Sequence, residues 1–236
     1  GRAYDVSVTV LAPRPSATLI GKSIQLPSTD ESRHIRLTSQ EELPQDARLT
    51  FALHARTPAA FSRDDRIEVA TVDGSWSTAL AQGSGMTLQN ARVAVATLDP
   101  AKAFGPWAFG PLRFRLVSAA GAGDWQPLAT LVRLPVLTGL ECSDSADAPC
   151  ELSGVNLFLL DSVSGDAAFG VPTVIPDGFT GHSLAVPRPA DGRLYVKLRD
   201  DPAVISVALV EAPAPRSQLH APGQGASAPG AAAADH

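Results

Sequence analysis

Hydrophobic and polar residues alternate along much of the chain, which is the pattern of half-buried β-strands. In the clearest case Leu112, Phe114 and Leu116 alternate with Arg113 and Arg115. Because successive side chains of a strand point to opposite faces, this segment predicts a strand with one face on a core and the other in water. The same period recurs at residues 48–56, 67–71, 92–98, 128–134, 194–199 and 204–210.

Turn sequences separate these segments. Asp-Gly pairs stand at 73–74 and 191–192, glycine-rich turns at 83–85 and 121–123, and a Pro-Asp-Gly turn at 176–178. Short strands between such turns are typical of a sandwich or a barrel. No stretch of ten or more residues has helical spacing, and a single helical turn at 58–61 is the most that we expect. The fold class predicted is all-β.

The composition divides the chain into parts. A proline-rich connector at 11–30 follows the first strand, and a fresh strand pattern begins at Val136 directly after Pro135. We therefore predict two tandem immunoglobulin-like β-sandwich domains, a larger one at 1–135 and a smaller one at 136–212.

The segment 213–236 has a different character. Fifteen of its 24 residues are Ala, Pro or Gly, and Leu219 is its one large aliphatic residue. Such a composition cannot bury enough apolar surface to offset the entropy of ordering. We predict a disordered linker or tail.

Residues 136–210 resemble the IPT/TIG family of immunoglobulin-like domains, which occur in surface receptors, bacterial surface proteins and some polysaccharide enzymes. The residues that carry the resemblance are Val136–Leu140, Leu152–Leu157, Val163, Leu184–Pro187 and Leu194–Leu198. The motif implies a tight bend at Gly154 and a turn capped by the side chain of Asn156. The run Phe158–Asp161 and the proline-rich middle depart from the family pattern. The resemblance implies a fold and no fixed activity.

The overall composition excludes some classes of function. With 19 basic and 24 acidic residues the net charge is −5, so the chain has no surplus of positive charge for a phosphate backbone, and nucleic acid is not an expected partner. No apolar run approaches the roughly 18 residues that a transmembrane helix needs. We expect a folded, soluble chain without a transmembrane segment.

Cys142 and Cys150 are the only cysteines, and a polar stretch that contains a proline separates them. Such a loop can fold back, so we predict a disulfide and with it an extracytoplasmic location, periplasmic, cell-surface or secreted. The alternative is a pair of reduced thiols in a cytosolic protein.

Two pairs of neighbouring carboxylates, Asp64 with Asp65 and Asp200 with Asp201, follow an arginine beside a predicted strand. Carboxylates at loop ends can bind Ca²⁺ through their oxygens. The alternative is ordinary turn chemistry, in which each aspartate caps a turn and pairs with the flanking arginine. No other cofactor is expected.

The most unusual local sequence is the doubled Phe-Gly-Pro at 104–111, which contains Phe104, Trp107 and Phe109. Trp76 and Trp125 also lie next to turns. Exposed aromatic rings on a fixed backbone could bind a sugar or a protein partner. The alternative is an aromatic plug that closes one end of a sandwich.

Three functional hypotheses remain. The first is a non-enzymatic structural, adhesion or assembly module of a larger bacterial-type surface or envelope protein, with a protein or an envelope polysaccharide as its partner. The second is a carbohydrate-binding accessory module of a secreted hydrolase. The third is an enzyme with acidic groups such as Glu68, Asp99 or Asp161, and no sequence motif supports it.

Overall fold

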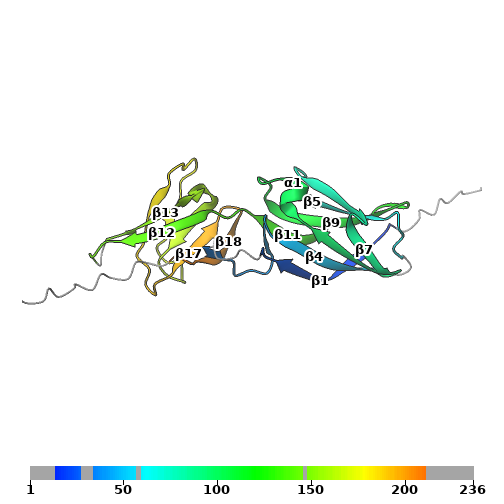
Figure 1. Cartoon of the computed structure of the whole chain (residues 1–236), viewed down its shortest axis with the longest axis horizontal. Coiled ribbons are helices and arrows are strands. Elements are labelled where there is room, and N and C mark those ends of the chain that lie inside the picture. The colour runs from blue at the N-terminus through cyan, green and yellow to red at the C-terminus, as the bar shows by residue number, and fades with distance from the viewer. Residues whose placement is uncertain (1–13, 28–33, 57–59, 146–147, 211–236) are drawn as a thin grey trace, which may run out of the picture.

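The computed structural model describes residues 14–27, 34–56, 60–145 and 148–210. These residues are mostly β-structure, which confirms the all-β prediction. They form two lobes that lie end to end along the long axis of the molecule (Figure 1). Each lobe has its own hydrophobic core. The predicted tail at 213–236 lies outside the described residues.

The N-terminal lobe is one curled sheet. Its strand order is β1-β4-β8-β7-β6-β5-β9-β11-β3, with β10 paired to β9. The strands are β1 (Ala17–Gln25), β3 (Glu42–Pro44), β4 (Arg48–Ala55), β5 (Arg66–Thr71), β6 (Ser77–Gln82), β7 (Gly85–Asn90), β8 (Val93–Leu98), β9 (Gly110–Ser118), β10 (Gly121–Ala122) and β11 (Gln126–Val132). Side chains join β1 to β11: Lys22 Nζ donates to the Leu128 carbonyl at 2.7 Å, and Gln126 Nε2 donates to the Ala17 carbonyl at 2.6 Å. The sheet thus wraps around its core.

The alternation predicted from the sequence sets the inner face of this sheet. Leu112, Phe114 and Leu116 of β9 are buried, whereas the intervening arginines are partly exposed. Phe114 packs on Phe51 of β4 with ring centroids 6.0 Å apart. Burial of each such side chain contributes roughly 1.5–3 kcal/mol relative to an exposed position, so the alternating pattern also supplies the stability.

A short helix, α1 (Pro100–Phe104), lies in the N-terminal lobe where the sequence analysis expected none. The Asp99 side chain accepts a hydrogen bond from the Lys102 amide, and Pro100 occupies the start of the helix. Asp-Pro is a helix-start signal because the carboxylate caps a free amide and proline has the helical φ. Of the helical turn expected at 58–61, residues 58 and 59 lie outside the described residues, and residues 60 and 61 are not helical.

The C-terminal lobe is built from two sheets. One has the order β12-β13-β16 and the other β15-β14-β17-β18-β2. The strands are β2 (Ile35–Arg36), β12 (Val136–Cys142), β13 (Cys150–Val155), β14 (Leu160–Ser164), β15 (Thr173–Val174), β16 (Ser183–Val186), β17 (Leu194–Leu198) and β18 (Asp201–Ala208). Residues from both sheets share one core, among them Leu140 and Leu152 of the first and Val163 and Val196 of the second. The lobe is therefore sandwich-like.

The strand β2 belongs to the C-terminal lobe, although its residues precede most of the N-terminal lobe in the chain. It pairs antiparallel with β18, and Ile35 is buried in the C-terminal core. The chain therefore passes between the lobes three times, between β1 and β2, between β2 and β3, and between β11 and β12. A two-residue strand carries no periodic signal, so the sequence pattern could not reveal this exchange.

Two details of the motif at 152–157 differ from the expectation. Gly154 lies within β13 rather than at a bend, and a Cβ there would meet the Val136 carbonyl oxygen at 2.5 Å. The glycine is therefore needed for the close approach of two strands. Asn156 has a left-handed backbone with φ of 59°, and its side chain makes no capping hydrogen bond. Its contribution is the backbone conformation that asparagine tolerates.

The predicted disulfide between Cys142 and Cys150 is present. The two residues are directly opposite each other in the β12–β13 pair, and Cys150 is buried in the C-terminal core. Residues 146–147 of the loop that it closes are outside the described residues. The bridge ties together two strands of one sheet in one lobe.

We predict that replacing both cysteines by serine lowers the free energy of unfolding of the C-terminal lobe by roughly 2–3 kcal/mol, because the unfolded chain loses a nine-residue cross-link. Amide hydrogen exchange measures the loss of stability separately for each lobe. Protection should fall in β13 and β17 and stay the same in β4 and β9. Unchanged protection of the C-terminal strands would contradict a stabilising role for the bridge.

Candidate functional site

A polar contact between distant parts of the chain lies where the lobes meet. Arg133, between β11 and β12, binds Asp200, which precedes β18 in the C-terminal lobe. The Arg133 amide and Nε both donate to Asp200 Oδ2, at 2.8 and 2.9 Å, and Nη2 donates to Oδ1 at 2.6 Å. The Asp200 side chain is 1% exposed and the Arg133 side chain 16%. This is a bidentate, buried and charge-assisted pair.

The same arginine also contacts the N-terminal lobe. Its guanidinium lies over the ring of Phe109, 3.9 Å from the ring centroid. Phe109 in turn packs against Trp76, with ring centroids 6.0 Å apart. Arg133 thus links an aromatic pair of one lobe to a buried carboxylate of the other.

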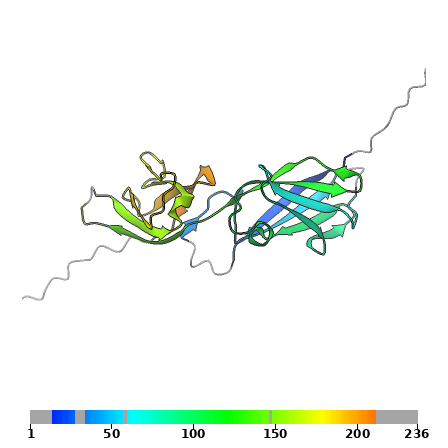
Figure 2. The same cartoon turned by 90° about the horizontal axis from the view of Figure 1, so that it is seen from above.

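Hydrogen bonds along the segment 34–41 add to this junction, the narrow waist visible in Figure 2. Thr38 Oγ1 donates to the Ile205 carbonyl at 2.6 Å, and the Leu209 amide donates to the His34 carbonyl at 2.6 Å. On the other side the Thr130 amide donates to the Glu41 carbonyl at 2.8 Å. The segment is therefore bonded to both lobes.

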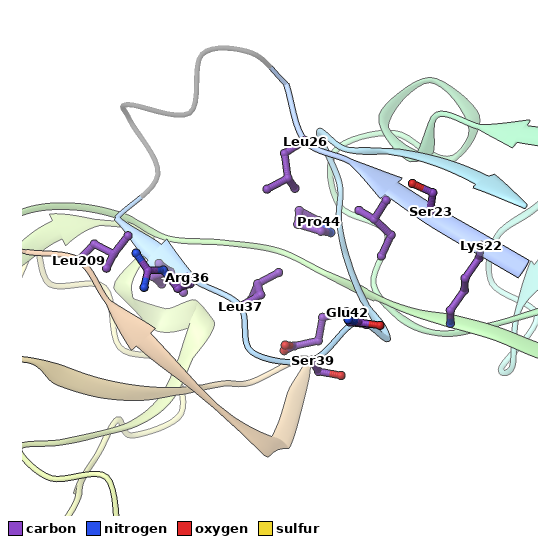
Figure 3. A pocket seen from close by; sticks show the side chains of 12 residues that line it. Lys22, Ser23, Leu26, Arg36, Leu37, Ser39, Glu42, Pro44 and Leu209 are labelled. Carbon is purple, nitrogen blue, oxygen red and sulfur yellow. The ribbon is translucent and has the colours of Figure 1, made fainter.

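A cavity of about 520 Å³ opens beside this segment (Figure 3). Its lining comes from β1 and the residue after it, from β2, from the turn between β2 and β3, from β3, and from the residue after β18. The residues are Lys22, Ser23, Ile24, Leu26, Ile35, Arg36, Leu37, Ser39, Gln40, Glu42, Pro44 and Leu209. The wall combines an aliphatic surface with a few polar groups, as ligand sites do.

Glu42 is the unusual member of this lining. The residue is 2% exposed, and neither carboxyl oxygen has a hydrogen-bond partner among the described residues. It is held there because β3 pairs in parallel with β11, which places Glu42 opposite Thr130. A buried carboxylate without partners is costly when it is ionised.

Burial is the main reason that the pKa of Glu42 rises, to about 7, and the negative charge of Asp201 raises it further. The backbone amide of Ser39 acts in the opposite direction without forming a hydrogen bond of good geometry. Lys22 does not neutralise Glu42, because its Nζ is engaged by Glu41 and by the Leu128 carbonyl. Glu42 therefore titrates near neutral pH.

The aromatic residues singled out from the sequence do not form one platform. Phe104 is buried in the N-terminal core, whereas Trp107 is 61% exposed and Phe109 40% exposed. Trp125 is covered by Arg113 and Arg115, whose guanidinium carbons lie 4.5 and 4.2 Å from its ring centroid.

Trp107 lines a second cleft, of about 340 Å³, at the junction. Arg133, Pro106 and Asn156 lie in the same lining. The cleft thus takes residues from both lobes, and the exposed indole of Trp107 is part of its wall.

The aspartate pairs lie in different lobes and bind protein groups. Asp65 is buried and accepts a hydrogen bond from the Ser62 amide at 2.9 Å, while Asp64 is exposed. Asp200 is engaged by Arg133, and Asp201 is partly buried at the start of β18. In the described part of the chain no group of three or more His, Cys, Asp or Glu is placed to hold a metal ion.

The three acids considered for an enzyme also lie apart from one another, and each has a partner within the protein. Glu68 binds Arg115 at 2.7 Å, Asp99 caps α1, and Asp161 accepts a hydrogen bond from Ser162 Oγ at 2.8 Å. The structure does not bring these three side chains to one site.

Sequence reasoning missed Arg133 and Glu42. Arg133 stands in an ordinary strand-end context, and its partner is 67 residues away. Glu42 follows another glutamate, and its burial depends on the β3–β11 pairing and on the exchange of β2 between the lobes. Neither residue has a local signal that could have found it.

Comparison with family models and with curated proteins gives no relative from which a role could be transferred. No family model matches the chain, and no curated protein matches it. No helix among the described residues is long and apolar enough to cross a membrane.

We predict that the free energy of unfolding falls as pH rises from about 4.5 to about 7. Between the ordinary pKa of about 4.5 and the folded value of about 7, the folded state keeps a proton on Glu42 that the unfolded chain loses. The free energy of unfolding therefore decreases with pH across this window, and the loss is complete above it.

Glu42→Gln should remove this dependence and be more stable than the wild type at about pH 8.5, by about 1–3 kcal/mol. Urea unfolding at a series of pH values measures the difference. Glu151→Gln, at an exposed position of β13, is the matched control and should follow the wild type. A wild type as stable at high pH as at low pH would contradict the burial of an ionisable, unpartnered Glu42.

Proposed function

We propose that the chain is a non-enzymatic, extracytoplasmic structural, adhesion or assembly module of a larger bacterial-type surface or envelope protein. In this proposal residues 1–135 and 136–212 are two immunoglobulin-like β-sandwich domains, with β2 exchanged into the second domain. The module holds its two lobes at a fixed angle and presents them to a protein or an envelope polysaccharide.

The observation that carries the proposal is the Arg133 junction. An independent pair of domains needs only a single flexible connection, whereas here the chain passes between the lobes three times and a buried ion pair joins them. Domain contacts within a chain are otherwise mobile by default. A fixed geometry is useful to a spacer or an assembly element, because it sets the distance and direction between attached partners.

The disulfide supports the location. Structural disulfides form and persist in oxidising compartments, and the bridge between β12 and β13 suits the periplasm, the cell surface or a secreted protein.

We predict that both lobes tumble as one body. ¹⁵N relaxation of backbone amides should fit a single anisotropic diffusion tensor for β4, β9, β13 and β17. In Arg133→Met the two lobes should acquire separate correlation times, because the buried Asp200 loses its partner.

The matched control is Arg115→Met. Arg115 also pairs with a glutamate and lies over an aromatic ring, but all its partners belong to the N-terminal lobe. It should leave the common tumbling unchanged. Separate correlation times for the lobes of the wild-type protein would refute the rigid-module proposal.

Trp107 supports a second candidate, a carbohydrate-binding accessory module of a secreted hydrolase. Its exposed indole lines a cleft together with Arg133 and Asn156, and an aromatic face beside polar groups is suited to a sugar ring.

We predict for this candidate that an envelope polysaccharide or simple glycan raises the thermal unfolding midpoint, since a ligand that prefers the native state stabilises it. The rise should disappear in Trp107→Ala and persist in Trp125→Ala, whose indole is covered by two arginines. The carbohydrate-binding hypothesis would be refuted if no glycan shifted the unfolding midpoint, or if both variants kept the shift.

A further inference from the structure

Glu42 lies where three parts of the junction meet. It begins β3 of the N-terminal lobe, the segment 37–41 leads into it from the C-terminal lobe, and Asp201 of β18 acts on its charge. Figure 3 shows Glu42 beside Ser39 and Leu37 of that segment. The unpartnered carboxyl group is thus enclosed by the elements that join the lobes.

The charged groups around Glu42 do not compensate a negative charge there. From β1, Lys22 is bound to Glu41 and to the Leu128 carbonyl. From β18, Asp201 is negative, and from β11 the residue opposite Glu42 is the uncharged Thr130. Arg36 of β2 lines the same cavity but is exposed.

We propose that the lobe junction is a pH-dependent lock, in which neutral Glu42 keeps the segment 37–41 closed over it and ionised Glu42 opens that segment and frees the lobes. This goes beyond the rigid module proposed above and makes its rigidity conditional on pH.

The mechanism follows from solvation. A neutral carboxyl group is far less costly to bury than a carboxylate, which needs water or a cation to be stable. Both carboxyl oxygens are closed off from solvent, and the segment 37–41 lies beside them (Figure 3), so in this proposal hydration of Glu42 displaces that segment. That movement breaks the hydrogen bond of Thr38 to Ile205 in the C-terminal lobe. The pKa of about 7 places the transition in the neutral range.

The bidentate Arg133–Asp200 pair is a separate contact that involves neither Glu42 nor the segment 37–41. It acts as the tether that remains when the segment opens. The lobes should therefore stay folded and connected while the distribution of distances between them widens.

The test is a pulsed electron–electron distance measurement between spin labels at Ser77→Cys and Val174→Cys. Both positions are exposed, one on β6 and the other on β15, so each label reports one lobe. Spectra are taken on the whole chain at about pH 5.5 and about pH 8.5, on either side of the neutral range.

The expected result is a narrow distance distribution at low pH that becomes at least about twofold wider at high pH, reversibly. In Glu42→Gln, which keeps the shape of the side chain and cannot ionise, the distribution should stay narrow at both pH values. Glu151→Gln, as the matched control, should widen as the wild type does.

Two results would overturn the lock. One is a wild-type distribution that is equally narrow at both pH values, which leaves the rigid module intact. The other is a widening of the same size in Glu42→Gln, which would assign the effect to another group. A distribution that is wide at low pH in every variant overturns the lock and the rigid module together.

Amide hydrogen exchange gives a second readout that needs no label. The Thr130 amide donates to the Glu41 carbonyl of the segment 37–41. Its exchange should speed up by about tenfold or more between the two pH values, after correction for the base-catalysed increase that the amides of β9 show. The excess should be absent from Glu42→Gln, and an excess that persists there contradicts the lock.

Discussion

The geometry of this molecule depends on the ion pair between Arg133 and Asp200. Asp200 is nearly inaccessible to solvent, and the arginine supplies all the hydrogen bonds that its carboxylate makes to described residues. Removal of one partner would leave a charge buried without compensation, which typically costs about 3–5 kcal/mol. Because Arg133 also stacks on Phe109 of the N-terminal lobe, the ion pair fixes the position of one lobe relative to the other.

The junction contains a second carboxylate with the opposite character. Asp200 is buried and fully bonded, whereas Glu42 is buried and has no described partner. The first stabilises the junction through its ion pair, and the second makes closure of the junction dependent on a proton. A proton on Glu42 and a fixed charge on Asp200 together determine how firmly the lobes are held.

Much of the fold could be predicted from the sequence, because strand periodicity is local. The alternation around Phe114, the Asp-Gly turns and the disulfide between Cys142 and Cys150 all depend on neighbours within about ten residues. The helix at Pro100 was missed although its Asp-Pro start is visible. The strand β2 could not be predicted, since its pairing with β18 joins residues far apart in the chain.

The candidate site was less accessible to prediction. Aromatic residues at turns drew attention, but their exposure is decided by packing: Phe104 faces the core and Trp107 does not. The sequence offered Asp200 either as a candidate calcium ligand or as a turn residue paired with the neighbouring arginine, and its partner Arg133, 67 residues away, has no local signal. Glu42 becomes unusual only when the β3–β11 pairing and the exchange of β2 between the lobes bury it.

The most direct test of the central claim is a double-mutant cycle on the junction pair, with Arg133→Met, Asp200→Asn and the combined variant measured by urea unfolding. The account predicts a coupling energy of about 2 kcal/mol or more between Arg133 and Asp200. The double variant should therefore lose less free energy of unfolding than the sum of the losses in the two single variants. A coupling energy near zero would contradict it, since the lobes would then be held together by other contacts.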